Sequence, residues 1–225
     1  MKKLLVVAGA AALSGCVSIL PEPGPAPLVF RIEAPDAPFQ QARKADWSIA
    51  IGRPSASRTL SGADLVLRED DNRIAFVGGA EWAEPTPDML QRALAAALTR
   101  SGKIVAATTE SSARADCELQ WDIYSFDARQ TADGFSARFE AAARLVGRNR
   151  AIQQSTQIAA TAEASGGTVR SAAAALTEAA LKGMDQAGGW ALQQTCEKPA
   201  ARVRQTVESP LVGNPATAVI PVPKR

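Results

Sequence analysis

The sequence predicts an α+β fold, a single domain in which two helices pack on one face of an antiparallel sheet. Long stretches of its second half alternate apolar and polar residues, as strands with one buried face do. Two further stretches carry apolar residues at helical spacing. Six of the 14 prolines lie within residues 21–38 and five within residues 199–223, so one folded domain is expected between these two regions.

Short strands and one hairpin are expected in the first half of this domain. Apolar runs at Leu28–Ile32 and Trp47–Ile51 have the length and composition of strands. The apolar stretches 64–68 and 73–77 flank Glu69-Asp70-Asp71-Asn72, a polar sequence typical of a hairpin turn. The two flanking stretches are therefore expected to pair with each other.

The first helix follows this hairpin. Thr86 is a plausible N-cap and Pro87 a favoured first helical residue, while Gly102 is well placed to end the helix. An apolar stripe runs along the helix between these limits. A strand is expected to return over residues 103–107.

Three long antiparallel strands are expected next, followed by a second helix. Residues 117–124 alternate without interruption, and residues 135–145 do the same after a turn at Asp133-Gly134. Residues 153–163 repeat the pattern more weakly. The final helix is expected from about residue 168 to residue 195, and its alanines allow close packing on the sheet. The other face of the sheet is expected to meet solvent.

The first residues have the pattern of a secretory signal. Lys2 and Lys3 precede a ten-residue apolar run, Leu4–Leu13. Ten helical residues rise about 15 Å, which is half of a roughly 30 Å hydrocarbon core, so the run is too short to span a membrane. Leu13-Ser14-Gly15-Cys16 then resembles the bacterial lipobox, in which the cysteine is acylated and becomes the mature N-terminus. The alternative is an ordinary signal with a chance cysteine at this position.

These features divide the chain into four parts. Residues 1–15 are expected to be a lipoprotein signal peptide, and residues 16–27 a proline-rich tether that could lift the domain about 35 Å off the membrane. Residues 28–196 form the folded domain, and residues 197–225, which lack a periodic apolar face, are expected to be disordered. Acyl chains on Cys16 would hold the mature protein firmly on a bilayer.

Charge and composition argue against several functions. The chain has 25 basic and 23 acidic side chains, so removal of Lys2 and Lys3 with the signal leaves a neutral mature protein. A neutral surface does not favour nucleic acid, because phosphate binding needs a basic excess. There is no histidine, the commonest general base and metal ligand. We therefore expect no catalytic residues, no metal site, no cofactor and no enzymatic activity.

Two carboxylates on one face of the strand at 117–124 are the best catalytic candidates. Glu118 and Asp122 are four residues apart, which at about 3.3 Å per residue separates them by about 13 Å. Glycosidase pairs lie roughly 5–9.5 Å apart. We therefore expect these two side chains to be solvated or to face a partner.

Two cysteines remain for the folded domain, and they admit two interpretations. Cys117 is on the inward face of a strand and Cys196 ends the last helix, which packs on that sheet. They could form a disulfide in an oxidising periplasm, which would stabilise the domain by about 4–5 kcal/mol in the chain-entropy model. Alternatively, both are reduced and buried.

One tryptophan lies in an unusual setting. Trp82 follows Gly78 and Gly79 and precedes Glu84 and Pro85, which suggests a rigid loop that holds one large side chain at the entry to the first helix. The ring is expected to cover the core or to contact a partner. Trp82 and Glu84 are therefore candidates for a partner-contact loop.

Six segments of the chain follow one another in a particular order. They are Ile49-Ala50-Ile51-Gly52-Arg53-Pro54, Leu60-Ser61-Gly62-Ala63-Asp64-Leu65-Val66-Leu67-Arg68, Arg73-Ile74-Ala75-Phe76, Ala80-Glu81-Trp82-Ala83-Glu84, Met89-Leu90-Gln91 and Ser101-Gly102. This order resembles the ABC-type transport auxiliary lipoproteins, which include the paraquat-inducible protein C type lipoproteins. The strand Asp122-Ile123-Tyr124-Ser125-Phe126 resembles a further strand of that family. The likeness extends over about residues 28–195.

The resemblance implies a lipid-anchored protein of the outer membrane of a Gram-negative bacterium, facing the periplasm. It would hold or receive the periplasmic end of an intermembrane lipid transport system whose other parts are an MCE-domain protein and an ABC permease with its ATPase. Contact with phospholipid and a homo-oligomeric ring are further expectations, whereas no catalytic residues carry over. The alternative is a structural or assembly lipoprotein, similar to a pilot protein, that takes no part in lipid transport.

Overall fold

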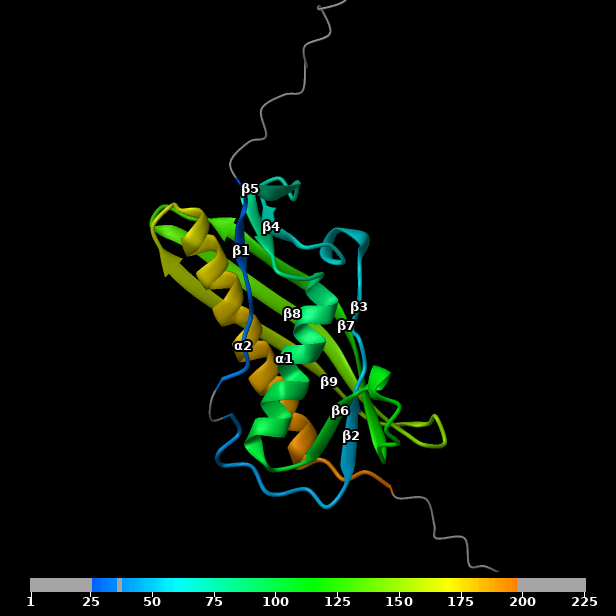
Figure 1. Cartoon of the computed structure of the whole chain (residues 1–225). Coiled ribbons are helices and arrows are strands. Elements are labelled where there is room, and N and C mark those ends of the chain that lie inside the picture. Colours follow the sequence, from blue (N-terminus) through cyan, green and yellow to red (C-terminus); the bar gives the residue numbers. More distant parts are fainter. Residues whose placement is uncertain (1–25, 36–37, 198–225) are drawn as a thin grey trace, which may run out of the picture.

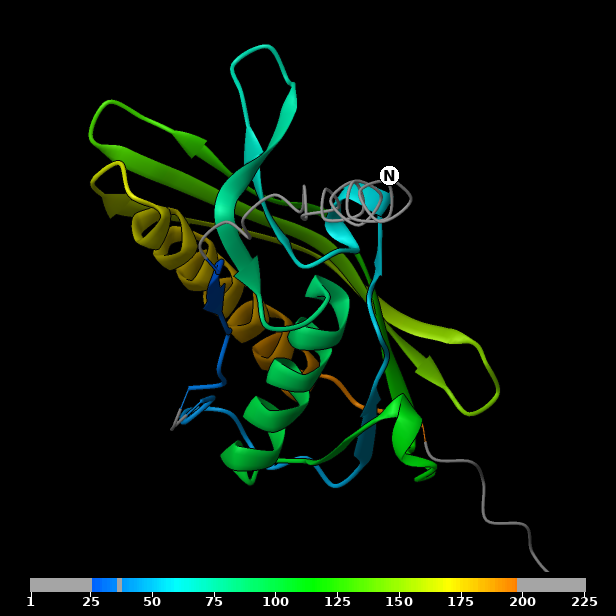
Figure 2. The ribbon, with the colours of Figure 1, turned by 45° about the horizontal axis from the view of Figure 1, so that its top comes forward.

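The protein forms one mixed sheet of nine strands with two α-helices, seen here in a computed structural model that describes residues 26–35 and 38–197 (Figure 1). The helices are α1 (Thr86–Ser101) and α2 (Val169–Gln193). The strands are β1 (Leu28–Phe30), β2 (Ser48–Ile51), β3 (Ser55–Ala56), β4 (Asp64–Arg68), β5 (Ile74–Trp82), β6 (Val105–Thr108), β7 (Cys117–Gln130), β8 (Gly134–Gly147) and β9 (Ile152–Ser165). The α+β class and the two helices on one side of the sheet agree with the sequence analysis (Figures 1 and 2).

The sheet is mixed, so the prediction of a purely antiparallel sheet is wrong. Along one edge of β7, the short strands β2, β3 and β4 follow one another and all run parallel to it. Strand β6 is parallel to β2, and β1 is parallel to β5. Parallel neighbours require a crossover connection, which here contains the β4–β5 hairpin and α1. Alternation in a sequence shows which residues share a face but not the direction of the neighbouring strand.

Strands β7, β8 and β9 form the predicted antiparallel meander. Trp121 lies opposite Ala143 and Phe126 opposite Phe139. The register of β7 shifts between Ile123 and Ser125, which marks a β-bulge. Helix α2 lies against one face of the sheet (Figure 2), which is buried on both sides of the bulge. The other face, which we call the open face, carries polar side chains.

Helix α1 begins one residue earlier than its sequence suggests. Pro85, and not Thr86, occupies the N-cap, and no side chain caps the helix. Thr86 is instead the first helical residue and is buried. The other end agrees with the prediction, because Gly102 takes a left-handed conformation at φ 63° and ends the helix.

The strand β5 occupies part of the segment that was expected to be a loop. It extends through Gly78 and Gly79 to Trp82, because its last residues pair with β1 as well as with β4. The short strand β3 and the 3₁₀ helices at Arg58–Leu60 and Thr109–Ser111 were not expected from the sequence. Each contains only two or three residues, too few for a periodic pattern to be recognised.

Helix α2 lies across the inner face of β7, β8 and β9 (Figure 1). The Oγ1 of Thr168 accepts a hydrogen bond from the backbone N–H of Ser171 at 3.2 Å and so caps its N-terminus. Small residues dominate the side of the helix that meets the sheet, and they bring the two backbones close together. At Gly183 the helix leaves no room for a side chain, because an added β-carbon would lie too close to the ring of Phe139.

The variant Gly183→Ala should therefore destabilise the domain relative to Gly189→Ala. A β-carbon at Gly183 would overlap the ring of Phe139, which is fully buried, whereas a β-carbon at Gly189 meets no atom within 4 Å. Both changes raise helix propensity equally, so the difference between them reports overpacking, about 1–3 kcal/mol. Urea denaturation of the two variants measures it. Equal stability of both variants would contradict the packing described for this helix.

Candidate functional site

The predicted lipidation site, Cys16, lies outside the described residues, as do the signal peptide and almost all of the tether. Its acylation stays a prediction. Residues 26–32 begin the described chain with β1, which pairs with β5. None of the described helices has the length and apolar character needed to cross a bilayer.

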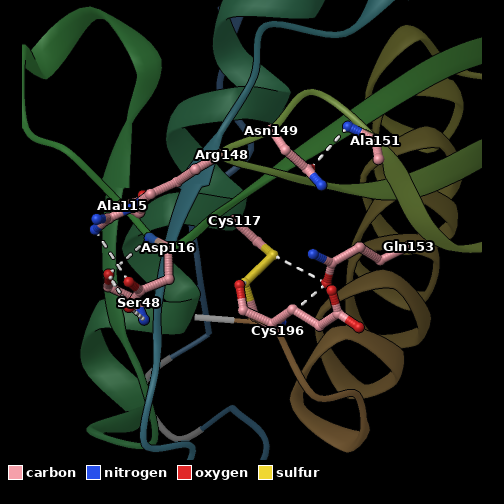
Figure 3. The surroundings of a disulfide bond; sticks show 10 residues. Ser48, Ala115, Asp116, Cys117, Arg148, Asn149, Ala151, Gln153 and Cys196 are labelled. Carbon is pink, nitrogen blue, oxygen red and sulfur yellow. Dashed lines mark hydrogen bonds and ion pairs between the residues drawn. A yellow bond between two sulfur atoms is a disulfide. The ribbon is translucent and has the colours of Figure 1, made fainter. Parts of the chain in front are cut away.

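Cys117 and Cys196 are joined by a disulfide, the first of the two arrangements considered for them (Figure 3). Their α-carbons are 6.1 Å apart, and both residues are buried. The side chain of Gln153, at the start of β9, lies beside the bond and accepts a hydrogen bond from the backbone N–H of Glu197 at 3.1 Å. Because Cys196 lies just after α2, the disulfide connects the end of this helix to the first residue of β7.

Hydrogen bonds and an ion pair connect the strands at the same end of the sheet. The carboxylate of Asp116 accepts hydrogen bonds from the backbone N–H of Ser48 at 2.9 Å and from its hydroxyl at 2.8 Å. Arg148 adds an ion pair to Asp116 at 3.0 Å (Figure 3). These contacts hold β2, β7 and the β8–β9 turn together next to the disulfide. The polar groups named here bond to one another, as in a structural arrangement.

Trp82 is a core residue, so its side chain is not available to a partner. It is 2 % exposed, and its ring stacks on that of Phe126 at a centroid distance of 5.8 Å. Of the two interpretations of this residue, the cover on the core is the one that the structure supports. Glu84 is half-buried and forms an ion pair with Arg92, in the second turn of α1. The ion pair therefore holds the segment that precedes α1 against the helix.

Glu118 and Asp122 both lie on the open face, as expected. Asp122 forms an ion pair with Arg144 of β8 at 2.7 Å, and Glu118 accepts a hydrogen bond from Gln120 at 3.1 Å. The two carboxylates make no direct contact with each other, and they are linked through Gln120, which accepts a hydrogen bond from Arg144 at 3.4 Å. This arrangement suits a polar surface better than a catalytic pair.

A second polar cluster on the open face was not expected from the sequence. Asp127 of β7 is 5 % exposed and receives two hydrogen bonds from Arg68 of β4, at 2.9 and 2.8 Å. The hydroxyl of Ser125 lies against the same carboxylate and also accepts a hydrogen bond from Arg138 of β8 at 3.1 Å. The hydrogen bond to Asp127 is the main cause that raises the pKa of Arg68, so this guanidinium stays charged.

The open face presents a connected set of charged and polar groups. Its groups are guanidinium ions, carboxylates and hydroxyls that already bond to one another. The described part of the chain contains no cluster of three or more side chains suited to hold a metal ion. Exposed apolar side chains adjoin the polar ones: Tyr124 at the bulge of β7, and Ile74 and Phe76 on β5. A mixed face of this kind suits contact with another molecule.

Solved structures show the same fold. A protein from Xanthomonas campestris is 23% identical and has a TM-score of 0.67, and the match covers 73% of this chain and 94% of that one. An uncharacterised protein is 12% identical at a TM-score of 0.58, with 72% and 97% covered. Comparison with curated proteins gives no match.

The match to a sequence family is stronger evidence of relationship than these structural similarities. The sequence model of one family matches residues 30–186, which is most of the chain and nearly all of the nine-stranded sheet with its helices. This span agrees with the resemblance seen in the order of the sequence segments. The chain belongs to the ABC-type transport auxiliary lipoprotein component family.

Proposed function

We propose that this protein is a non-enzymatic lipoprotein that docks or receives the periplasmic assembly of an ABC/MCE-type lipid transport system at the outer membrane. The observation that carries the proposal is the family match over residues 30–186. The family consists of lipoproteins that are auxiliary components of ABC-type transport. Acyl chains on Cys16 would fix the domain to the bilayer, and residues 16–27 would let it reach a partner.

The open face of the sheet is the surface we assign to the partner. Helix α2 covers the inner face of the sheet, so another protein cannot reach that face (Figure 1). The open face combines ion pairs such as Arg144 with Asp122 and an exposed aromatic side chain, Tyr124, which is 60 % exposed. Aromatic and arginine side chains are the residues that contribute most to protein interfaces.

Site-specific photo-crosslinking in intact cell envelopes tests this function. A photo-reactive amino acid at Tyr124 samples the open face, and the same amino acid at Glu178, on an exposed part of α2, is the matched control. We expect the probe at position 124 to capture an MCE-domain protein or an ABC permease and the probe at position 178 to capture neither. Capture of another envelope complex from position 124, without any transport component, would instead favour an assembly role similar to that of a pilot protein.

A further inference from the structure

A hollow of about 310 Å³ lies where the β4–β5 hairpin meets the open face of the sheet. The hairpin rises from the sheet (Figure 2), and its residues Arg68 and Asn72 line the hollow. Three arginines from three different strands line it: Arg68 of β4, Arg129 of β7 and Arg138 of β8. Arginines that converge from separate strands indicate a site built by the fold and not by a local charge run.

The lining of the hollow has an excess of positive charge. Asp127 is the single carboxylate among the lining residues, so it balances one of the three guanidinium ions. Two other carboxylates approach from outside the hollow: Glu140 lies 3.4 Å from Arg138, and Asp70 lies 3.5 Å from Arg129. Both ion pairs are solvent-exposed and long, and such pairs contribute little.

Several N–H groups of these arginines have no acceptor among the described residues. Arg68 uses its Nε and Nη2 for Asp127 and Ser125, and its Nη1 makes no hydrogen bond. Arg138 uses its Nε and Nη1, and its Nη2 makes none. Among the described residues, Arg129 has one polar partner, Asp70, in the long ion pair. Arginines with unused guanidinium donors thus line one hollow from three strands.

The carboxylate of Asp127 holds the guanidinium group of Arg68 in place. The bidentate contact from Asp127, itself 5 % exposed, fixes the plane of the Arg68 guanidinium. A donor that is already oriented loses little conformational freedom when it binds a ligand. Polar side chains complete the lining of the hollow: Asn72 from the hairpin turn, Ser136 from β8 and Thr161 from β9.

We propose that this hollow binds a phosphate-type anion. Guanidinium groups bind phosphate oxygens through paired N–H donors, and hydroxyl and amide groups supply further hydrogen bonds. The volume is at the small end of the range for ligand pockets, about 300–1,000 Å³, which fits a phosphate monoester or a single phosphodiester headgroup. The proposal depends on these residues alone and stands apart from the function proposed above.

Isothermal titration calorimetry of the full-length protein in non-ionic detergent tests the site. Three titrants carry the same chemistry from different sources: inorganic phosphate, glycerol 3-phosphate and dihexanoyl phosphatidylglycerol below its micelle concentration. We expect saturable binding of at least one of them, which weakens as the salt concentration rises. In the double variant Arg129→Gln/Arg138→Gln the affinity should fall at least about tenfold, because charge-assisted hydrogen bonds are lost.

The control variant is Arg144→Gln. Arg144 is on the same strand and the same face as Arg138 and forms a shorter ion pair, with Asp122 at 2.7 Å, but it does not line the hollow. It should bind every titrant as the unmodified protein does, and thermal unfolding of all variants confirms that they are folded. Binding of the lipid alone, if lost in the double variant, assigns the site to a headgroup, whereas binding of the two free phosphates assigns it to soluble anions. No binding, or an equal loss in Arg144→Gln and the double variant, would overturn the proposal.

Discussion

Replacement of both Cys117 and Cys196 by alanine is expected to lower the free energy of unfolding by about 4–5 kcal/mol. The two residues are 79 positions apart, so their disulfide closes a long loop in the unfolded chain and restricts it strongly. In the folded protein the bond also holds the end of α2 against β7. Urea denaturation of the oxidised protein and of the double variant measures the difference.

Reduction provides the control for this prediction. With a reductant present in both samples, the unmodified protein and the double variant should unfold at nearly the same urea concentration, because both then lack the cross-link. If the protein isolated from cell envelopes already has two titratable thiols after denaturation and runs identically on reducing and non-reducing gels, the disulfide is absent and the prediction is wrong.

The variant Phe126→Ala is expected to cost about 3–5 kcal/mol. Phe126 is 2 % exposed and joins two other rings, stacking on Trp82 and meeting Phe139 edge to face at 5.9 Å. Its removal leaves a cavity at the point where β5, β7 and β8 meet, and it also removes two aromatic contacts. Chemical denaturation followed by circular dichroism measures the loss.

An exposed phenylalanine is the matched control. Phe76 of β5 is 52 % exposed, so Phe76→Ala should change the free energy of unfolding by less than about 1 kcal/mol. Similar losses in the two variants would show that the three-ring cluster is not the centre of the core.

The long strands and both helices could be predicted from the sequence because each has a periodic signal. The strands β7, β8 and β9 contain 14 residues each, long enough for the alternation to be recognised, although it is weaker in β9 than in β7 and β8. The left-handed Gly102 and the cap at Thr168 mark helix ends by local chemistry. In such places the local sequence and the tertiary structure agree.

The direction of the neighbouring strands could not be predicted in this way. Strands β2, β3 and β4 lie side by side with β7 only because the chain between 68 and 117 crosses back through α1. The bulge near Tyr124 also has no sequence signal of its own, although it changes which residues of β7 face the open side. Both features arise from packing between distant segments.

The polar cluster on the open face was missed for the same reason. Arg68 and Asp127 are 59 residues apart and belong to strands whose pairing was not foreseen. Each residue alone is an ordinary charged side chain at a strand position that faces solvent. Only the parallel pairing of β4 with β7, at Leu67 and Ala128, brings them together.

Mass spectrometry of the mature N-terminal peptide tests most directly whether this domain works from a membrane surface. Acylation and cleavage at the lipobox would leave Cys16 as the first residue with three acyl chains, and this is the result we predict. A mature protein that begins elsewhere, or in which the thiol of Cys16 is free to react, would contradict a membrane-anchored role in transport.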